Sequence, residues 1–301
     1  VMLKLFELSN LRFAIAHVNF TLRGEESEED ARFVSQIANN LRVPFYLKKF
    51  DAKAFAAEHR FSLQEAARIL RYGWFEELIS VSGYDLYATA HHFDDQIETF
   101  FINLLRGTGV AGLRGIQARH GNCIRPLLFA SRPEIEKFAR NYRLNYREDS
   151  SNRSDAYLRN RIRRNILPAL DNTDSGFRSG FARTFENLGM ARSFIDLQME
   201  NIRSVLIRNM AGNTIIFRNE LKGFKKTGLI LWELLKEFNF NRANVQFILQ
   251  ALEGTPGKTF YSETHMLLVD REELLIRPLD ENEMHAEDIL IDEEQTSIPA
   301  P

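Results

Sequence analysis

The first half of the chain alternates short apolar runs with longer segments in which apolar residues recur every three or four positions. This pattern predicts strands alternating with helices, and therefore an α/β fold with a parallel sheet covered by helices on both faces. The expected strands are 12–18, 43–50 and 84–90, and the expected helices are 27–41 (capped by Ser27), 62–81 and 93–106. In such sheets, ligands bind beyond the carboxyl ends of the strands.

Helical periodicity dominates after the glycine-rich segment 107–121. Pro168 and the stretch "DNTDSG" at 171–176 predict a domain boundary. We therefore expect one domain over 1–172, a smaller, mainly helical α+β domain over 173–279 and an acidic linker over 280–301. The elements expected here are helices 132–142, 155–170, 179–210, 226–238 and 241–252, and strands at "TIIFR", "KTFYS", "HMLLVD" and "ELLIR".

The composition of the 301 residues, 44% hydrophobic and 27% charged, is typical of a soluble globular protein. No apolar run is long enough to span a membrane. The single cysteine, Cys123, excludes an internal disulfide and a cysteine zinc site, and it fits a reducing cytoplasm. The net charge of −2 includes eight acids in 280–301, which holds no Lys or Arg. The remainder is mildly basic and permits an anionic partner.

The stretch "ATAHHFDDQIETFF" at 88–101 places unusual chemistry after a predicted buried strand. His91, Asp94, Asp95 and Glu98 share one stripe of the expected helix. Acids near a helix start also suit the helix dipole, and that structural explanation is favoured for any single acid. Two histidines followed by two aspartates favour function instead. Such carboxylates could hold Mg²⁺ among phosphates or act as a base, and a nearby imidazole could shuttle a proton.

Three further stretches carry polar residues at expected loops or helix faces. "HVNFTLRGEES" (His17, Asn19, Arg23, Gly24) is either a nucleotide-binding loop or an ordinary polar loop. On "EAARILRY", Arg68 and Arg71 either clamp phosphates or cover the surface with their stems. "LLRGTGVAGLRG", which includes Arg106, Gly107 and Thr108, has the features of a helix C-cap and flexible loop.

The segment 158–170 is rich in arginine and has no acid. It carries Arg159, Arg161, Arg163 and Arg164, with Asn160 among them. A solvated helix face normally alternates both signs of charge. The pattern therefore favours contact with a nucleic-acid backbone.

Taken together, these stretches resemble the tRNA(Ile)-lysidine synthetases, a family of the N-type ATP pyrophosphatase (PP-loop) superfamily. The resemblance covers about residues 12–170 in the family's order and continues more weakly over 177–277. The matching stretches are "HVNFTLRGEES", "EAARILRYGWF", "TAHHFDDQIETFFINLLRGTGVAGLRGI", "IRPLL", "EDSSN" and "YLRNRIRRNILP".

The resemblance implies that ATP adenylates the carbon-2 oxygen of the wobble cytidine, after which the lysine amine displaces AMP. ATP, Mg²⁺, L-lysine and an isoleucine tRNA with a CAU anticodon would be the cofactors and partners. The implied catalytic residues are Asp94, Asp95, His91, His92 and Glu98, with Asp94 and Asp95 as metal ligands. The implied nucleotide-binding residues are His17, Asn19, Arg23, Gly24, Arg68, Arg71, Arg106, Gly107 and Thr108, and the implied tRNA-binding residues are Arg159, Asn160, Arg161, Arg163 and Arg164.

The sequence departs from the family at its start. The pyrophosphate-binding loop Ser-Gly-Gly-x-Asp-Ser is absent, and "VMLKLFEL" resembles the helix that follows it. Either the chain begins just after the loop, which its first residue favours, or the loop has been lost. In the second case the chain should be inactive, because backbone amides would no longer hold pyrophosphate. The acidic end suggests that a small C-terminal domain is also missing.

Three alternatives stay open. A sulfur-inserting tRNA thiolase of the same superfamily would normally bring additional cysteines, which the solitary Cys123 disfavours. A non-catalytic RNA-binding fragment would show no heat on mixing with ATP. A metal-dependent hydrolase would act without ATP and would be inhibited by chelators. Whether the protein forms a homodimer also stays open.

Overall fold

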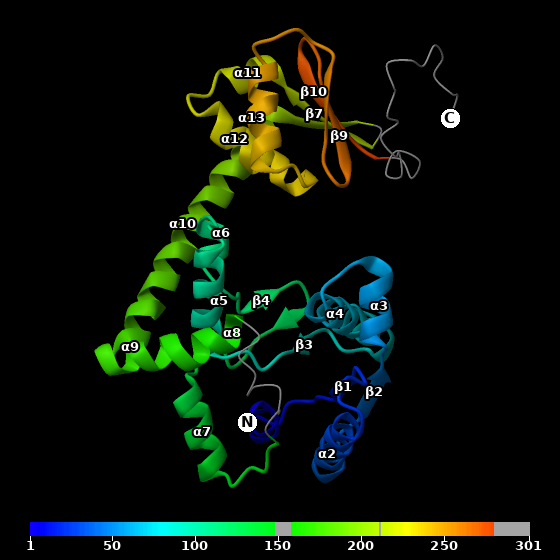
Figure 1. Cartoon of the computed structure of the whole chain (residues 1–301), viewed down its shortest axis with the longest axis vertical. Coiled ribbons are helices and arrows are strands. Elements are labelled where there is room, and N and C mark those ends of the chain that lie inside the picture. Colours follow the sequence, from blue (N-terminus) through cyan, green and yellow to red (C-terminus); the bar gives the residue numbers. More distant parts are fainter. Residues whose placement is uncertain (148–157, 211, 280–301) are drawn as a thin grey trace, which may run out of the picture. The chain divides into compact units, whose positions relative to one another are not determined.

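The computed structural model describes residues 1–147, 158–210 and 212–279 (Figure 1). The chain divides into two compact units, Val1–Gly189 and Met190–Pro301. The stretch "EDSSN" and the predicted acidic linker 280–301 lie outside the described residues. None of the helices formed by the described residues is both long and apolar enough to cross a lipid bilayer.

The first unit alternates strands and helices, as the hydrophobic pattern predicts, and then becomes helical. Its last helix continues into the second unit. The elements are α1 (Met2–Leu8), β1 (Ile15–Asn19), α2 (Glu25–Leu41), β2 (Phe45–Lys49), α3 (Ala52–His59), α4 (Leu63–Ser82), β3 (Tyr87–Ala88), α5 (Phe93–Leu105), α6 (Val110–Leu113), β4 (Arg119–His120), β5 (Cys123–Ile124), α7 (Arg132–Asn141), α8 (Leu158–Arg161), the π-helix η2 (Ile162–Ile166), α9 (Leu167–Thr173) and α10 (Phe177–Leu206).

The strands of the first unit form two separate hydrogen-bonded groups. β1 pairs with β2 in parallel, whereas β3 pairs with β5 in parallel and β4 joins β5 antiparallel. β1 and β3 are therefore not hydrogen-bonded to each other. An apolar pocket of about 450 Å³ lies between them, lined by Ala16 of β1, Ala88 of β3 and Phe75 of α4, among others.

Local sequence signals explain where most helices begin and end, and they also explain why one predicted helix start is wrong. Ser62 caps α4 by accepting a hydrogen bond from the backbone N–H of Glu65. The predicted cap Ser27 instead lies inside α2, because the helix starts after Gly24, whose φ of +54° turns the chain. Pro168, predicted together with 171–176 to mark a domain boundary, lies in the continuous helical run 158–173, two residues after the π-helix η2 ends.

The second unit packs helices against one face of a five-stranded sheet with the order β6-β7-β10-β9-β8 (Figure 1). All its strand pairs are antiparallel. The predicted helix to residue 210 is wrong at its end, because α10 stops at Leu206 and β6 follows directly. The elements are β6 (Ile207–Met210), β7 (Asn213–Phe217), α11 (Arg218–Lys222), α12 (Thr227–Leu235), the 3-10 helix η3 (Lys236–Phe238), α13 (Arg242–Ala251), β8 (Lys258–Tyr261), β9 (His265–Val269) and β10 (Glu273–Pro278).

Candidate functional site

The titratable residues after β3 form the first turns of α5. His92 is the N-cap, and a capping box joins it to Asp95. Asp95 Oδ2 accepts from the backbone N–H of His92 at 2.9 Å, while His92 Nδ1 accepts from the backbone N–H of Asp95 at 3.4 Å. The cap satisfies backbone donors that would otherwise lack partners at a helix start. It also fixes the direction of the Asp95 carboxylate.

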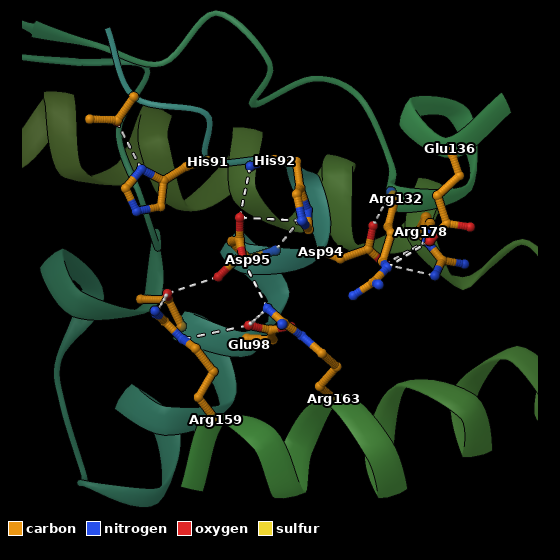
Figure 2. A network of polar contacts seen from close by, with 12 residues as sticks. His91, His92, Asp94, Asp95, Glu98, Arg132, Glu136, Arg159, Arg163 and Arg178 are labelled. Carbon is orange, nitrogen blue, oxygen red and sulfur yellow. Dashed lines mark hydrogen bonds and ion pairs between the residues drawn. The ribbon is translucent and has the colours of Figure 1, made fainter. Parts of the chain in front are cut away.

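Asp94 is buried and joins three helices (Figure 2). Its Oδ2 accepts from the backbone N–H of Arg132, the first residue of α7, at 2.6 Å. Its Oδ1 accepts from the Arg178 guanidinium of α10 at 2.7 Å, and Arg178 also pairs with Asp171 of α9. A buried carboxylate with an ion pair and a backbone donor is fully engaged. Asp94 therefore holds α5, α7 and α10 together.

Glu98, one turn further along α5, is the most buried acid of the group, with an exposed fraction of 0%. The Arg163 guanidinium donates to both of its oxygens, at 2.6 and 3.0 Å, and to Asp95 Oδ1 at 3.2 Å (Figure 2). Arg159 Nη2 donates to the neighbouring Thr99 hydroxyl at 3.0 Å. Burial raises the pKa of the Glu98 carboxyl, and the ion pair with Arg163 opposes this. The arginine-rich segment formed by α8 and η2 is thus anchored to α5 by charge.

His91 occupies the loop at the carboxyl end of β3. Its Nδ1 lies 2.9 Å from the Thr89 hydroxyl, which fixes the ring. Burial lowers the pKa of His91 to about 4, and the positive charges of Arg125, Arg159 and Arg68 act in the same direction, while Asp95 opposes it. The imidazole is therefore neutral at pH 7 and can take part in hydrogen bonds without adding charge.

A second polar cluster lines a pocket of about 500 Å³ beside β1 and α4, a volume suited to a small molecule. His17 and Asn19 come from β1, Arg23 precedes α2 and Arg71 comes from α4. Arg71 lies 5.4 Å above the ring of Phe20, which also lines the pocket. Burial lowers the pKa of His17, with Asp30 opposing and Arg71 reinforcing the shift. The pocket thus combines cations, a neutral imidazole and an aromatic ring.

Two family models match successive parts of the chain. One, described as "PP-loop domain", matches residues 1–170, and one described as "TilS substrate binding domain" matches residues 210–279. The chain is 42% identical to a tRNA(Ile)-lysidine synthase of Parabacteroides distasonis over 89% of its length. It is 34% identical to one of Bacteroides thetaiotaomicron, covering 99% of this chain and 69% of that protein. The chain belongs to the tRNA(Ile)-lysidine synthase family. The PP-loop match also confirms the predicted fold class.

The family relationship is broad, but the chain is shorter than its relatives. It spans 60% of the Parabacteroides distasonis synthase and 58% of a 38% identical synthase from Porphyromonas gingivalis. Among solved structures, it is similar to the U34-tRNA thiolase NcsA from Methanococcus maripaludis with its [4Fe-4S] cluster. That similarity has a TM-score of 0.48 and 16% identity over 60% of this chain and 62% of that one, and it carries no further weight.

The nucleotide-binding residues implied by the lysidine synthase resemblance separate into three places. His17, Asn19, Arg23 and Arg71 line the pocket beside β1. Gly24 is the N-cap of α2, and Arg68 stacks on Tyr72 outside that lining. The carboxylates of Asp94 and Asp95 do not line this pocket either.

The Arg106–Thr108 segment lies at the far end of α5 from His91 and Asp95. Arg106 is the exposed C-cap of the helix, and Gly107 follows with φ +70°, the left-handed conformation that ends helices. Thirteen residues at about 1.5 Å each separate the two ends by about 20 Å. Arg106 therefore lies about one helix length from His91 and Asp95, and its assignment to the nucleotide site stays a prediction.

The predicted tRNA-binding arginines do not share one exposed face. Arg159 and Arg163 turn towards α5 and engage Thr99, Glu98 and Asp95. Asn160 is buried, whereas Arg161 and Arg164 are exposed. The sequence pattern overstated the basic surface, because the acids that neutralise these arginines come from α5, about 65 positions earlier in the chain.

Asp94 and Asp95, predicted to bind Mg²⁺, have other partners in the described arrangement. Asp94 accepts hydrogen bonds from Arg178 and a backbone N–H, and Asp95 accepts from Arg163 and from the backbone N–H of the helix cap. The described residues also contain no cluster of three or more His, Cys, Asp or Glu suited to a metal. Their assignment as metal ligands stays a prediction without structural support.

Sequence reasoning missed several residues of the network. Arg178 pairs with Asp94 across 84 positions, so no local spacing could reveal it. Thr89 holds His91, and the buried Arg125 acts on the same imidazole from the end of β5. Arg125 follows Ile124, which pairs with Ala88 of β3. Only the expectation that parallel strands end at one edge could have signalled it.

Proposed function

We propose that the protein uses ATP to join lysine to carbon-2 of the wobble cytidine of an isoleucine tRNA with a CAU anticodon. The observation that carries this proposal is the order of the two family matches, PP-loop domain followed by TilS substrate binding domain. The named relatives, which share 34–42% identity with this chain over most of its length, support the same function. The reaction would take place in the cytoplasm, consistent with the single cysteine of the sequence.

The proposed nucleotide site is the pocket beside β1. Arg71 supplies positive charge for phosphates, and the Phe20 ring and the neutral His17 offer contacts to a base or sugar. Arg23 forms ion pairs with Glu26 and with Asp30, which also lines the pocket, so its charge is already balanced there. A polar, partly apolar cavity of this volume suits an adenine nucleotide.

Within the network, Asp95 is the acid proposed to meet the substrates. Its side chain keeps 14% exposure, whereas Asp94 and Glu98 are almost fully buried. Arg163 and the His92 cap hold the Asp95 carboxylate in place, and the neutral His91 lies in the preceding loop. Asp94 and Glu98 would therefore be positioning residues. The exposed Arg161 is proposed to contact the tRNA backbone.

The decisive experiment measures ATP-dependent incorporation of labelled lysine into an isoleucine tRNA transcript with a CAU anticodon. We expect Asp95→Asn to reduce the rate at least about a hundredfold, as expected for loss of a positioned acid–base group. Arg71→Ala should weaken ATP binding measured by calorimetry, whereas the exposed Arg140→Ala of α7 should not. Full activity of Asp95→Asn would reject the assigned site. Absence of lysine transfer by the full-length protein would reject the function.

The same measurements separate the alternatives. A non-catalytic RNA-binding protein would bind the transcript without any heat from ATP. A thiolase would incorporate sulfur and not lysine, and none of the curated relatives reported above carries that name. A metal-dependent hydrolase lacks support, because no suitable ligand cluster exists in the described part of the chain.

A further inference from the structure

The antiparallel sheet of the second unit is covered by the helices on only one face. Leu274 and Ile276 of β10 lie opposite Val269 and Leu267 of β9, and all four belong to the core formed with α12 and α13. Because side chains alternate along a strand, the residues between them lie on the other face. None of those intervening residues belongs to the core cluster.

We call this second surface the open sheet face and define it by Arg208, Ile215, Phe217, Tyr261, Leu268 and Leu275. The register puts four of them in one row: Arg208 lies opposite Ile215, Ile215 opposite Leu275, and Leu275 opposite Leu268. Phe217 lies two residues from this row along β7, and Tyr261 lies two residues from it in the other direction on the edge strand β8. The four aliphatic and phenyl side chains are half-buried, and Tyr261 keeps 56% of its surface exposed. A face with half-buried apolar side chains and an exposed aromatic ring offers a surface that another molecule can cover.

The open sheet face also carries charged residues: the alternation along β10 places Glu273, opposite Phe217, and Arg277 on this face beside Arg208, so that two arginines face one acid. The Arg208 guanidinium lies 5.7 Å above the Phe217 ring and donates only to the backbone carbonyls of Ser204 and Ile207. Among the described residues it has no carboxylate partner. An apolar protein partner would bury this cation unpaired, at high cost. A polyanion would neutralise it, and the exposed ring of Tyr261 on the opposite edge strand would be available for stacking.

We propose that the open sheet face binds unpaired nucleotides of the tRNA substrate, with a base stacking on Tyr261 and with Arg208 contacting phosphate. This inference rests on the proposed function, which makes tRNA the substrate, and it names the surface in the second unit that holds it. Sheets bind single-stranded RNA in this way because every base offers a flat ring to an aromatic side chain, and arginine adds charge.

The stacking part is tested by measuring the Kd of the full chain for the isoleucine tRNA transcript by fluorescence anisotropy. Tyr261→Ala should weaken binding at least about fivefold, the lower limit for loss of one stacked base. Tyr261→Trp should retain affinity, because a larger ring still stacks. Phe247→Ala is the matched control, since Phe247 is 58% exposed in the same unit but lies on α13 and not on the sheet.

The charge part uses a second matched pair. Arg208→Ala should lower the slope of log Kd against log salt by about one, as expected for one lost phosphate contact. Arg242→Ala is the control, because Arg242 also lies over a ring, that of Trp232, but on the helical side of the unit. It should leave the slope unchanged. Circular dichroism of all variants checks that each remains folded.

The outcomes separate the two proposals. If the protein transfers lysine and Tyr261→Ala and Arg208→Ala bind tRNA like the unsubstituted chain, the open sheet face is rejected and the function stands. Equal weakening by Phe247→Ala also rejects the surface. If the unsubstituted chain binds tRNA through these residues but transfers no lysine, the function fails and the surface stands. Failure to bind the transcript at all rejects the surface.

Discussion

Arg163 offers the sharpest test of how the network stabilises the first unit. Arg163→Met removes the guanidinium but keeps much of the aliphatic stem, so the change is mainly the loss of charge and hydrogen bonds. Glu98 then loses two short hydrogen bonds, and Asp95 loses one. Removal of one partner from a buried ion pair costs about 3–5 kcal/mol, because the remaining charge lacks compensation.

The structure points to the lower end of this range. The Glu98 side chain is 0% exposed, whereas that of Arg163 is 25% exposed, so the pair is partly screened by solvent. Arg159 remains with its Nε 3.5 Å from Glu98 and recovers part of the lost attraction. We therefore expect a loss of about 3 kcal/mol. For a unit of this size, that corresponds to a fall in Tm of roughly 6–12 °C.

Urea unfolding followed by circular dichroism measures the change as a lower midpoint with an unchanged m value. Arg161→Met is the matched control, because Arg161 is exposed on the adjacent helix and belongs to none of these ion pairs. It should change stability by less than about 0.5 kcal/mol. The double variant with Glu98→Gln should lose less than the sum of the two single variants, since both remove the same interaction.

The pH dependence gives an independent check. Burial already raises the pKa of Glu98, and without Arg163 it should rise further. The folded variant then holds a proton that the unfolded chain has released, so its stability falls as pH rises. The destabilisation by Arg163→Met should thus be smaller at pH 5 than at pH 8. A loss below 0.5 kcal/mol, or one equal to that of Arg161→Met, would refute the reasoning.

Three other predictions address neighbouring features. Because the pKa of His91 is lowered to about 4, the unfolded chain binds a proton between pH 4 and 6.5 that the folded chain excludes, so the free energy of unfolding rises with pH in this range. His91→Gln should reduce the slope of that free energy against pH, measured in urea titrations, by at most about 1.4 kcal/mol per pH unit. Identical slopes would contradict the assigned pKa. Arg178→Met should cost about 3 kcal/mol in thermal unfolding by leaving the Asp94 charge buried, and an unchanged Tm would show that Asp94 needs no ion pair. Gly112→Ala should lower the free energy of unfolding by about 1–3 kcal/mol, because the new Cβ would lie 2.1 Å from the Thr108 hydroxyl. Gly73→Ala, in the middle of α4 with open space around it, should raise the free energy of unfolding by about 0.5–1 kcal/mol. Equal effects of the two substitutions would disprove the clash.

Local patterns in the sequence predicted the elements of the fold better than their association. Strands β1, β2 and β3 and helices α2, α4 and α5 follow from apolar periodicity and from caps such as Ser62. The pairing of strands is a long-range property that no single strand encodes. That is why the sequence does not show that β1 and β3 lack hydrogen bonds to each other.

The candidate site shows the same limit in terms of charge. The sequence brought out His91, Asp94, Asp95 and Glu98 because they crowd one helix turn. It did not reveal that Arg163 and Arg178 approach them from later helices. Net charge along a segment counts only near neighbours, whereas ion pairs form in space. An arginine that the local sequence predicts to be a surface cation can therefore form an ion pair with a buried acid that is distant in the sequence.

The long separation between these partners has a consequence for how the protein is made. A ribosome that adds about 5–20 residues per second produces Arg178 roughly 4–17 s after Asp94. Arg163 follows Glu98 after 65 residues, so for most of that interval the acids of α5 lack the guanidinium groups that pair with them and must remain hydrated. The nascent α5 therefore cannot settle into its native surroundings while the chain is still short. Any factor that shields newly made segments would act on this helix before the arginines arrive.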